Sequence, residues 1–183
     1  MTRAELLKTA KPMRLTTRQV IATLDGTMTE IRIPIKFAIR NHAGAFLDSR
    51  YNEVKPPFQP GDIIYVRETW GKDKHGEYHY RANYPEHDCE PYPIWHQSIH
   101  MPKEAARIFL EVTGAKVERV HDITDEGAKA EGFNAGDKRS ANSSIAVTAK
   151  QAFMWTWQAI YDKRQFQWLS NPWARCISFK VLT

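Results

Sequence analysis

Residues 61–70 read GDIIYVRETW, and this stretch decides the fold of the 183-residue chain. A Gly-Asp turn leads into a run of β-branched and aromatic residues, which predicts a strand over 63–70. Residues 72–76 then read as a turn, and 77–82 as the returning strand. The chain is therefore built on hairpin-connected strands.

Alternation predicts a second strand over 29–36, with Ile31 and Ile33 on the core face and charged residues on the outer face. Pro34 lacks an N–H and favours a sheet edge or a bulge. Further strands are expected over 108–120, as one strand or as two that meet at Gly114, and over 173–182. A helix is expected from Thr16 or Thr17 to Gly26, because Gln19 follows Thr16 at a capping-box spacing. A short helix is expected to end at Gly132. A third is expected over 148–161, where an apolar stripe includes Phe153, Trp157 and Ile160. Strands mixed with helices predict a small α+β domain around a mixed or barrel-like sheet.

The chain is expected to form one domain that contains two long irregular segments. Residues 1–11 are expected to form an N-terminal arm and residues 12–183 a single domain. A proline-punctuated insertion is expected at about 83–102. A Gly/Ala/Ser/Asn-rich segment at about 133–146 is expected to be a mobile loop.

The net charge and the amino-acid composition limit the classes of function that the chain can have. The chain has 26 Lys and Arg against 21 acids, a formal charge of +5. This favours an anionic partner such as nucleic acid, although such a charge also serves solubility alone. The apolar fraction argues against disorder, and neither a membrane span nor a secretory segment is expected from the sequence. Cys89 and Cys176 form no paired motif, so reduced thiols and a cytoplasmic location are expected.

Two segments carry candidate binding residues. The first follows Gly26 and contains Thr29, Glu30, Arg32 and Lys36, whose cations and hydroxyls suit phosphate or nucleobase contact. The alternative is an ordinary solvated strand face.

The second segment is Arg67-Glu68-Thr69-Trp70. Alternation places Arg67 and Glu68 on opposite faces, so one of the two points toward the core and needs a partner. That partner is either a structural ion pair or part of a functional site. Trp70 is either a core residue or a stacking platform.

The sequence offers weaker candidates for a metal site and for a catalytic carboxylate. Loosely spaced histidines lie near Asp88 and Cys89, but interrupting prolines and the lack of a ligand motif argue against a metal; the histidines are His75, His79, His87, His96 and His100. Glu131, at a helix end, suits a general base or is a solvated carboxylate. No cofactor is expected.

Several segments together resemble one known family. They are Gly26–Arg32, Gly61–Trp70, Tyr80-Arg81-Ala82, Trp95–Pro102 (WHQSIHMP), Leu110–Thr113, Ile123 with Ala130-Glu131-Gly132, and Asn171-Pro172-Trp173. Over roughly residues 12–183 the chain resembles the ASCH-domain family of the PUA-like superfamily, especially its phage- and prophage-encoded members. This resemblance implies a PUA-like β-barrel or strongly curved mixed sheet with flanking helices and a cleft for RNA, modified bases or nucleotides.

The resemblance also implies a catalytic comparison. Some small bacterial ASCH proteins are amidohydrolases of N4-acetylcytidine that use a lysine, a threonine and a glutamate. The matching positions here are Met28, Ile31 and Glu131. Methionine offers only a weak acceptor and isoleucine no hydroxyl. We therefore expect this activity to be lost and the cleft to be kept for binding.

The leading hypothesis is a protein that binds RNA, single-stranded nucleic acid or a nucleotide. Cations would neutralise phosphate, aromatic rings would stack a base, and Glu131 and His100 would read a base edge; the cations are Arg32, Lys36, Arg67 and Arg81, and the rings Trp70, Tyr80 and Trp95. One alternative is a hydrolase of a modified nucleoside or a ribonuclease using Glu131. Another is a phage assembly or host-interaction protein that uses the tryptophan-rich C-terminal part.

Overall fold

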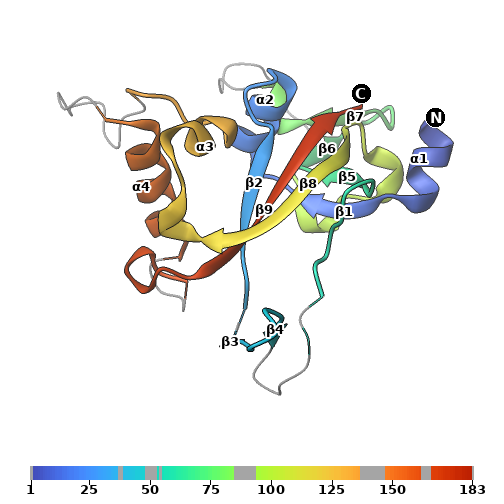
Figure 1. The fold of residues 1–183 in the computed structure, drawn as a ribbon. Coiled ribbons are helices and arrows are strands. Elements are labelled where there is room, and N and C mark those ends of the chain that lie inside the picture. The colour runs from blue at the N-terminus through green and yellow to red at the C-terminus, as the bar shows by residue number, and fades with distance from the viewer. Residues whose placement is uncertain are drawn as a thin grey trace. The chain divides into compact units, whose positions relative to one another are not determined.

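The computed structural model describes residues 2–36, 39–47, 53, 55–84, 94–136, 147–161 and 166–182 (Figure 1). The α-helices are α1 (Arg3–Thr9), α2 (Thr17–Leu24), α3 (Asp125–Ala130) and α4 (Ala149–Tyr161). The strands are β1 (Lys11–Arg14), β2 (Glu30–Pro34), β3 (Ile39–Arg40), β4 (Phe46–Leu47), β5 (Ile63–Arg67), β6 (Trp70–Lys72), β7 (Tyr78–Tyr80), β8 (Phe109–Arg119) and β9 (Trp173–Val181). Short 3₁₀ helices are η1 (Arg81–Asn83), η2 (Ser98–His100), η3 (Lys103–Ala105), η4 (Val120–Asp122) and η5 (Trp168–Ser170).

The main sheet is mixed and has the strand order β1-β5-β8-β9-β2. Strand β1 pairs with β5 in parallel, whereas β5 pairs with β8 and β2 with β9 in antiparallel fashion. Strands β1 and β2 end the order, so this sheet is open in the part of the chain described. The predicted α+β class and mixed sheet are confirmed. The edge position predicted from Pro34 is also confirmed, because β2 is an end strand.

The chain divides into two compact units. Unit 1 comprises residues 1–28, 61–112 and 179–183, and unit 2 comprises residues 29–60 and 113–178. Strands β8 and β9 each contribute residues to both units.

Unit 1 is organised around α2 and the strands β1 and β5. The predicted capping box is confirmed: Thr16 Oγ1 accepts the Gln19 N–H at 3.3 Å, and the Gln19 side chain accepts the Thr16 N–H at 2.9 Å. The helix stops before Gly26, whose φ of 74° suits glycine. A buried cluster fills this unit, formed by Leu6, Ala10, Tyr65, Met101, Ala105, Ala106 and Phe109.

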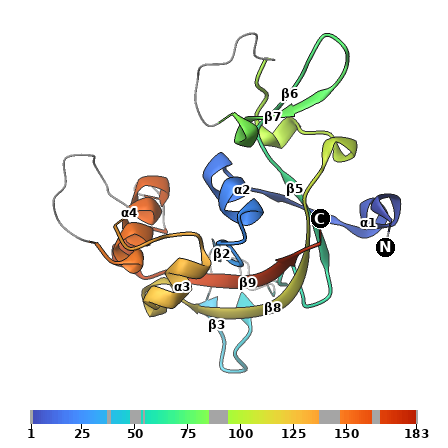
Figure 2. The ribbon, with the colours of Figure 1, turned by 90° about the horizontal axis from the view of Figure 1, so that it is seen from above.

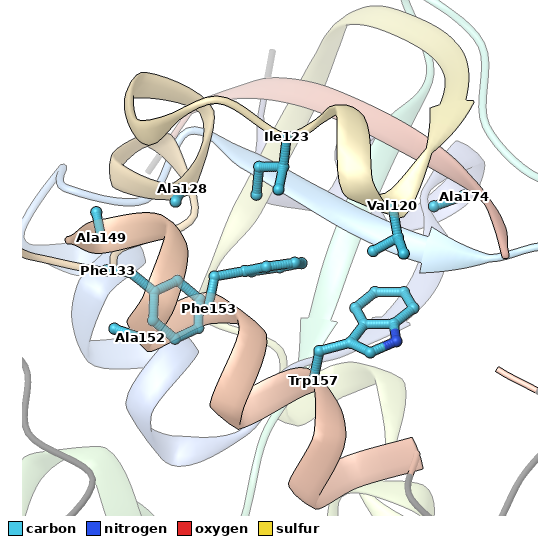
Figure 3. Packing of buried hydrophobic residues seen from close by; sticks show 9 residues of the cluster. All are labelled: Val120, Ile123, Ala128, Phe133, Ala149, Ala152, Phe153, Trp157 and Ala174. Carbon is cyan, nitrogen blue, oxygen red and sulfur yellow. The ribbon is translucent and has the colours of Figure 1, made fainter. Parts of the chain in front are cut away.

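Unit 2 has its own core, shown in Figure 3. Helices α3 and α4 lie side by side (Figure 2). The predicted helix over 148–161 is confirmed, because Phe153 and Trp157 of its apolar stripe are buried. Ile160, which the same periodicity placed on this stripe, is 50% exposed.

Two strand predictions differ in outcome. The strand predicted over 108–120 is confirmed as β8, one continuous strand. The strand predicted over 63–70 is interrupted: β5 ends at Arg67, and Trp70 starts β6, where it pairs with Tyr80. The interruption arises because Trp70 leaves the main sheet to form the β6–β7 hairpin.

Residues 85–93 and 137–146 are outside the described ranges, so most of the predicted insertion and of the predicted mobile loop is untested. Across the ranges that are described, no helix has the length and apolar character needed to cross a bilayer.

Candidate functional site

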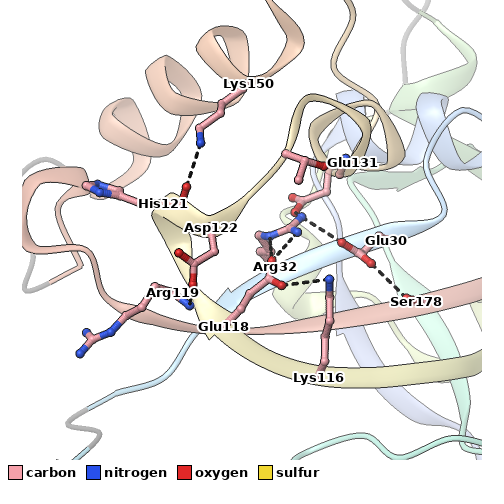
Figure 4. Close-up of polar contacts among 12 residues, drawn as sticks. Glu30, Arg32, Lys116, Glu118, Arg119, His121, Asp122, Glu131, Lys150 and Ser178 are labelled. Carbon is pink, nitrogen blue, oxygen red and sulfur yellow. Dashed lines mark hydrogen bonds and ion pairs between the residues drawn. The ribbon is translucent and has the colours of Figure 1, made fainter.

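Arg32 lies at the centre of a buried charge cluster in unit 2 (Figure 4). Its Nη1 lies 2.5 Å from Glu131 Oε1 and 3.0 Å from Glu30 Oε1. Its Nη2 lies 2.6 Å from Glu118 Oε1. The Arg32 side chain is only 2% exposed. One guanidinium is therefore shared among three carboxylates.

The expectation that Arg32 lies on an exposed outer face is wrong. Helix α3 packs against β2 and covers this face. A side chain at Gly127 of α3 would meet the Arg32 guanidinium, since a Cβ there would lie 3.2 Å from Nη2. Alternation assigns residues to two faces of a strand, but it does not say whether a later helix covers the second face.

Glu131 is held by this arginine. Its side chain is 6% exposed. Burial raises the pKa of Glu131 to about 7, and the neighbouring Arg32 guanidinium opposes that rise. Since its carboxylate is engaged in a short charge-assisted hydrogen bond, Glu131 is not presented to a ligand as the leading hypothesis expected.

The other residues at the resemblance's catalytic positions are apolar and buried. Met28 is 1% exposed and Ile31 7% exposed. Neither supplies a proton-transfer group. The predicted core orientation of Ile31 is confirmed.

Two more contacts complete the charge cluster. Lys116 Nζ lies 2.9 Å from Glu118 Oε2, and Ser178 donates to Glu30 Oε2 at 3.1 Å. Although burial raises it, the hydrogen bonds from Lys116 and Arg32 lower the pKa of Glu118 to about 2. With every carboxylate paired, the cluster is a structural network that fixes α3 and β8 to β2.

Unit 1 holds a second buried ion pair. Glu68 is 1% exposed, and Arg107 donates to both of its carboxylate oxygens at 2.9 Å. Of the two alternatives for a buried charge in this segment, the ion pair is the one observed. Arg107 also stacks over the Tyr80 ring at 4.1 Å and donates to Asn83 Oδ1 at 2.8 Å. This arginine thus ties the end of β5 to β7 and η1.

An open pocket of about 540 Å³ lies on unit 1. Its lining residues are Arg14, Leu15, Thr16, Thr17, Thr69, Gln97 and Ser98. They come from the end of β1, the first turn of α2, the residue before β6 and the start of η2. In the described part of the chain, the hydroxyls of Thr69 and Ser98 and the guanidinium of Arg14 have no hydrogen-bond partner.

Arg67 stands beside this pocket. The parallel register places Arg14 directly opposite Arg67 on neighbouring strands, about 4.8 Å apart, with both side chains on one face. Arg67 Nη2 donates to the carbonyl of Ile99, and within the described chain its buried Nε has no partner. Like charges directly opposite each other are unfavourable, and an anion between them would relieve this repulsion.

Aromatic and cationic side chains continue along the same segments. The Arg81 guanidinium lies 5.9 Å from the Trp95 ring, and Trp95 lies 5.9 Å from Tyr84. The Arg81 N–H donates to the carbonyl of Thr69, a pocket residue. Trp95 is two residues before Gln97, another pocket residue. Unit 1 therefore places this aromatic and cationic group next to two of the pocket residues.

The remaining predicted residues are dispersed. Trp70 packs against the unit 1 core, and the Tyr80 hydroxyl donates to the Ala105 carbonyl at 2.6 Å. His100 is exposed on η2. Thr29 and Lys36 are exposed in unit 2. Among the histidines, His87 lies outside the described residues, and no metal-binding group of His, Cys, Asp or Glu is found within them.

The sequence-based reasoning missed most of the pocket. Its residues Arg14, Thr17, Gln97 and Ser98 were not selected as site residues. One signal was present: Met13 and Leu15 alternate with polar neighbours, the pattern of a short strand, and both are buried. That pattern would have placed Arg14 on the face opposite to the core.

No family model matches this chain, and no curated protein matches it. Among solved structures, an ASCH domain from Lactobacillus crispatus JV V101 is similar, with a TM-score of 0.46, 12% identity, and coverage of 99% of this chain and 86% of that chain. A protein from Enterococcus faecalis V583, of the family model DUF984, has a TM-score of 0.43, 10% identity, and coverage of 91% of this chain and 69% of that chain. The solved structures similar to this chain therefore include an ASCH domain, the family to which the sequence resemblance points.

Proposed function

We propose that this protein is an ASCH-type, PUA-like protein that binds single-stranded nucleic acid, RNA in the first place, through unit 1. The observation that carries the proposal is the pocket beside Arg14 and Arg67. It offers the Arg14 guanidinium, the Nε of Arg67 and the hydroxyls of Thr69 and Ser98, none of which has a hydrogen-bond partner in the described part of the chain.

Charge and hydrogen bonding support a phosphate in this pocket. A phosphate between the two arginines relieves their repulsion and accepts hydrogen bonds from guanidinium and hydroxyl groups. The first turn of α2 also lines the pocket, and a helix N-terminus favours negative charge. The chain's net charge of +5 acts in the same direction.

The aromatic pair beyond the pocket supports a polymer carrying bases. Single-stranded ligands bind by combining a cationic groove with rings on which bases stack. Trp95, flanked by Arg81 and Tyr84, supplies such a ring in the segment that leads into the pocket. Arg32 and Glu131 are not part of this proposal, because they neutralise each other inside unit 2. A phage or prophage origin and a bacterial cytoplasmic location remain part of the proposal through the sequence resemblance.

The test is fluorescence anisotropy of a labelled 12-nucleotide single-stranded RNA, with single-stranded and duplex DNA in parallel. Wild-type protein is compared with Arg14→Ala, Arg67→Ala and the control Lys129→Ala, which removes an exposed cation from unit 2. Each phosphate contact contributes about 0.7 to the slope of log affinity against log salt for single strands. We expect Arg14→Ala and Arg67→Ala each to reduce the slope by about that amount, and Lys129→Ala to leave it unchanged.

Absence of binding to all three nucleic acids contradicts the proposal. So does binding that Lys129→Ala weakens as much as Arg14→Ala does.

A further inference from the structure

Three side chains of the β6–β7 hairpin and the residues that follow it form a chain of hydrogen bonds in unit 1. Asp73 Oδ2 lies 3.1 Å from His79 Nε2, and His79 Nδ1 lies 2.9 Å from the Tyr84 hydroxyl. All three side chains are partly exposed. A carboxylate, an imidazole and a phenol thus stand in series at the protein surface.

The direction of these hydrogen bonds follows from their chemistry. The N–H groups of Glu77 and His75 donate to Asp73 Oδ1 at 2.9 and 2.8 Å. The Glu77 N–H and the His79 side chain, the largest influences, lower the pKa of Asp73 to about 2, so it is a carboxylate at neutral pH. A carboxylate only accepts, so His79 Nε2 carries the proton. In the neutral imidazole Nδ1 is then the acceptor, and the Tyr84 hydroxyl donates to it.

We propose that this relay makes Tyr84 a nucleophile for acyl groups, with His79 as its general base and Asp73 as the residue that orients the imidazole. In this step the Tyr84 oxygen forms a bond to the acyl carbon. The bond from that carbon to its leaving group breaks, and the leaving group departs with the electron pair. The phenol proton passes to His79 Nδ1. Nucleophile, base and orienting carboxylate are the three parts that such activation needs.

The residues around Tyr84 indicate where an acylated ligand would lie. Its ring packs against Trp95, which also lies next to Arg81. An acylated ligand held at that surface would bring its carbonyl toward the phenol. The reactivity of the relay itself does not depend on nucleic-acid binding, so the two proposals fail independently.

Tyr80 is a matched internal control. Its hydroxyl donates to a backbone carbonyl rather than to a base, and burial raises the pKa of Tyr80. The full-length protein is treated with p-nitrophenyl acetate, and acetylation at each tyrosine is followed by peptide mass spectrometry. We expect Tyr84 to react at least about a hundredfold faster than Tyr80, the lower end of the range for general-base assistance.

The Asp73→Asn variant tests the activation of Tyr84 while it keeps the hydrogen bonds that stabilise the hairpin turn. The asparagine keeps an oxygen for the two turn N–H groups, but its amide donates to Nε2. His79 Nδ1 must then carry the proton and can no longer accept one from Tyr84. We expect this variant and His79→Gln to lower the Tyr84 rate about tenfold or more relative to the acetylated lysines, with circular dichroism unchanged. Equal rates at Tyr84 and Tyr80, or a Tyr84 rate that survives Asp73→Asn, overturns the proposal.

Discussion

Replacing Arg32 by methionine tests the buried network most severely. The substitution keeps much of the side-chain volume and removes the one guanidinium that three carboxylates share. Removing one partner of a buried ion pair costs about 3–5 kcal/mol, because the remaining charge stays desolvated. Here Glu131, at 6% exposure, is the carboxylate that cannot reach water.

The cost must also depend on pH. The pKa of Glu131 in the folded protein is about 7, above its ordinary value near 4.5, so folded Glu131 holds a proton more readily than unfolded Glu131. The stability due to such a group is present at low pH and is lost as pH rises through the folded pKa. Without Arg32 that pKa rises further, so the loss in Arg32→Met is larger at pH 8 than at pH 5.

Urea unfolding followed by tryptophan fluorescence at pH 5 and pH 8 gives the two free energies, with Lys129→Met as a surface control. We expect about 3–5 kcal/mol of destabilisation at pH 8, a smaller loss at pH 5, and less than about 0.5 kcal/mol for the control. If Arg32→Met lies within about 1 kcal/mol of wild type at pH 8, Arg32 is not the residue that stabilises the buried carboxylates.

Three further perturbations give distinct outcomes. The pKa of Glu118 in the folded protein is about 2, below its ordinary value, so the stability that Glu118 provides is lost as pH falls from about 4.5 toward 2. The Glu118→Gln variant should therefore lose stability less steeply than wild type over that interval. Acid unfolding followed by circular dichroism measures this difference. Arg107→Ala leaves the buried Glu68 without its cation and should lower the thermal midpoint clearly more than Arg81→Ala does, and equal midpoints would contradict the pairing. Thr16→Ala removes the cap of α2 and should cost about 0.5–2 kcal/mol in urea unfolding, with no change signifying that the cap is not formed.

Local signals predicted most of the elements. The capping residue Thr16 and the glycine after α2 predicted the two ends of that helix. An apolar stripe that includes Phe153 and Trp157 predicted α4. The strand predicted over 108–120 agrees with β8, Phe109–Arg119, to within one residue at each end. These features depend on neighbours within a few positions in the chain, so one sequence suffices to read them.

Contacts between distant residues account for the rest. Glu68 finds its cation 39 residues later, and no spacing rule links it to Arg107. Arg32 belongs to a strand whose outer face α3 covers almost a hundred residues further on, and Glu131 follows that helix. Strand β1 is four residues long, contains a proline, and is fixed by parallel pairing with β5. The local alternation around Arg14 indicates its face of the strand, but only the pairing with β5 brings Arg14 opposite Arg67.

The proposal that unit 1 binds nucleic acid is tested most directly by finding where on the protein the RNA binds. Backbone amide shifts of isotope-labelled protein are followed by NMR during titration with a short single-stranded RNA. We expect the largest changes at Thr17, Thr69 and Ser98 around the pocket, with smaller changes near Trp95. Changes centred on Arg32 and Glu131, or none at saturating RNA, would contradict binding through unit 1.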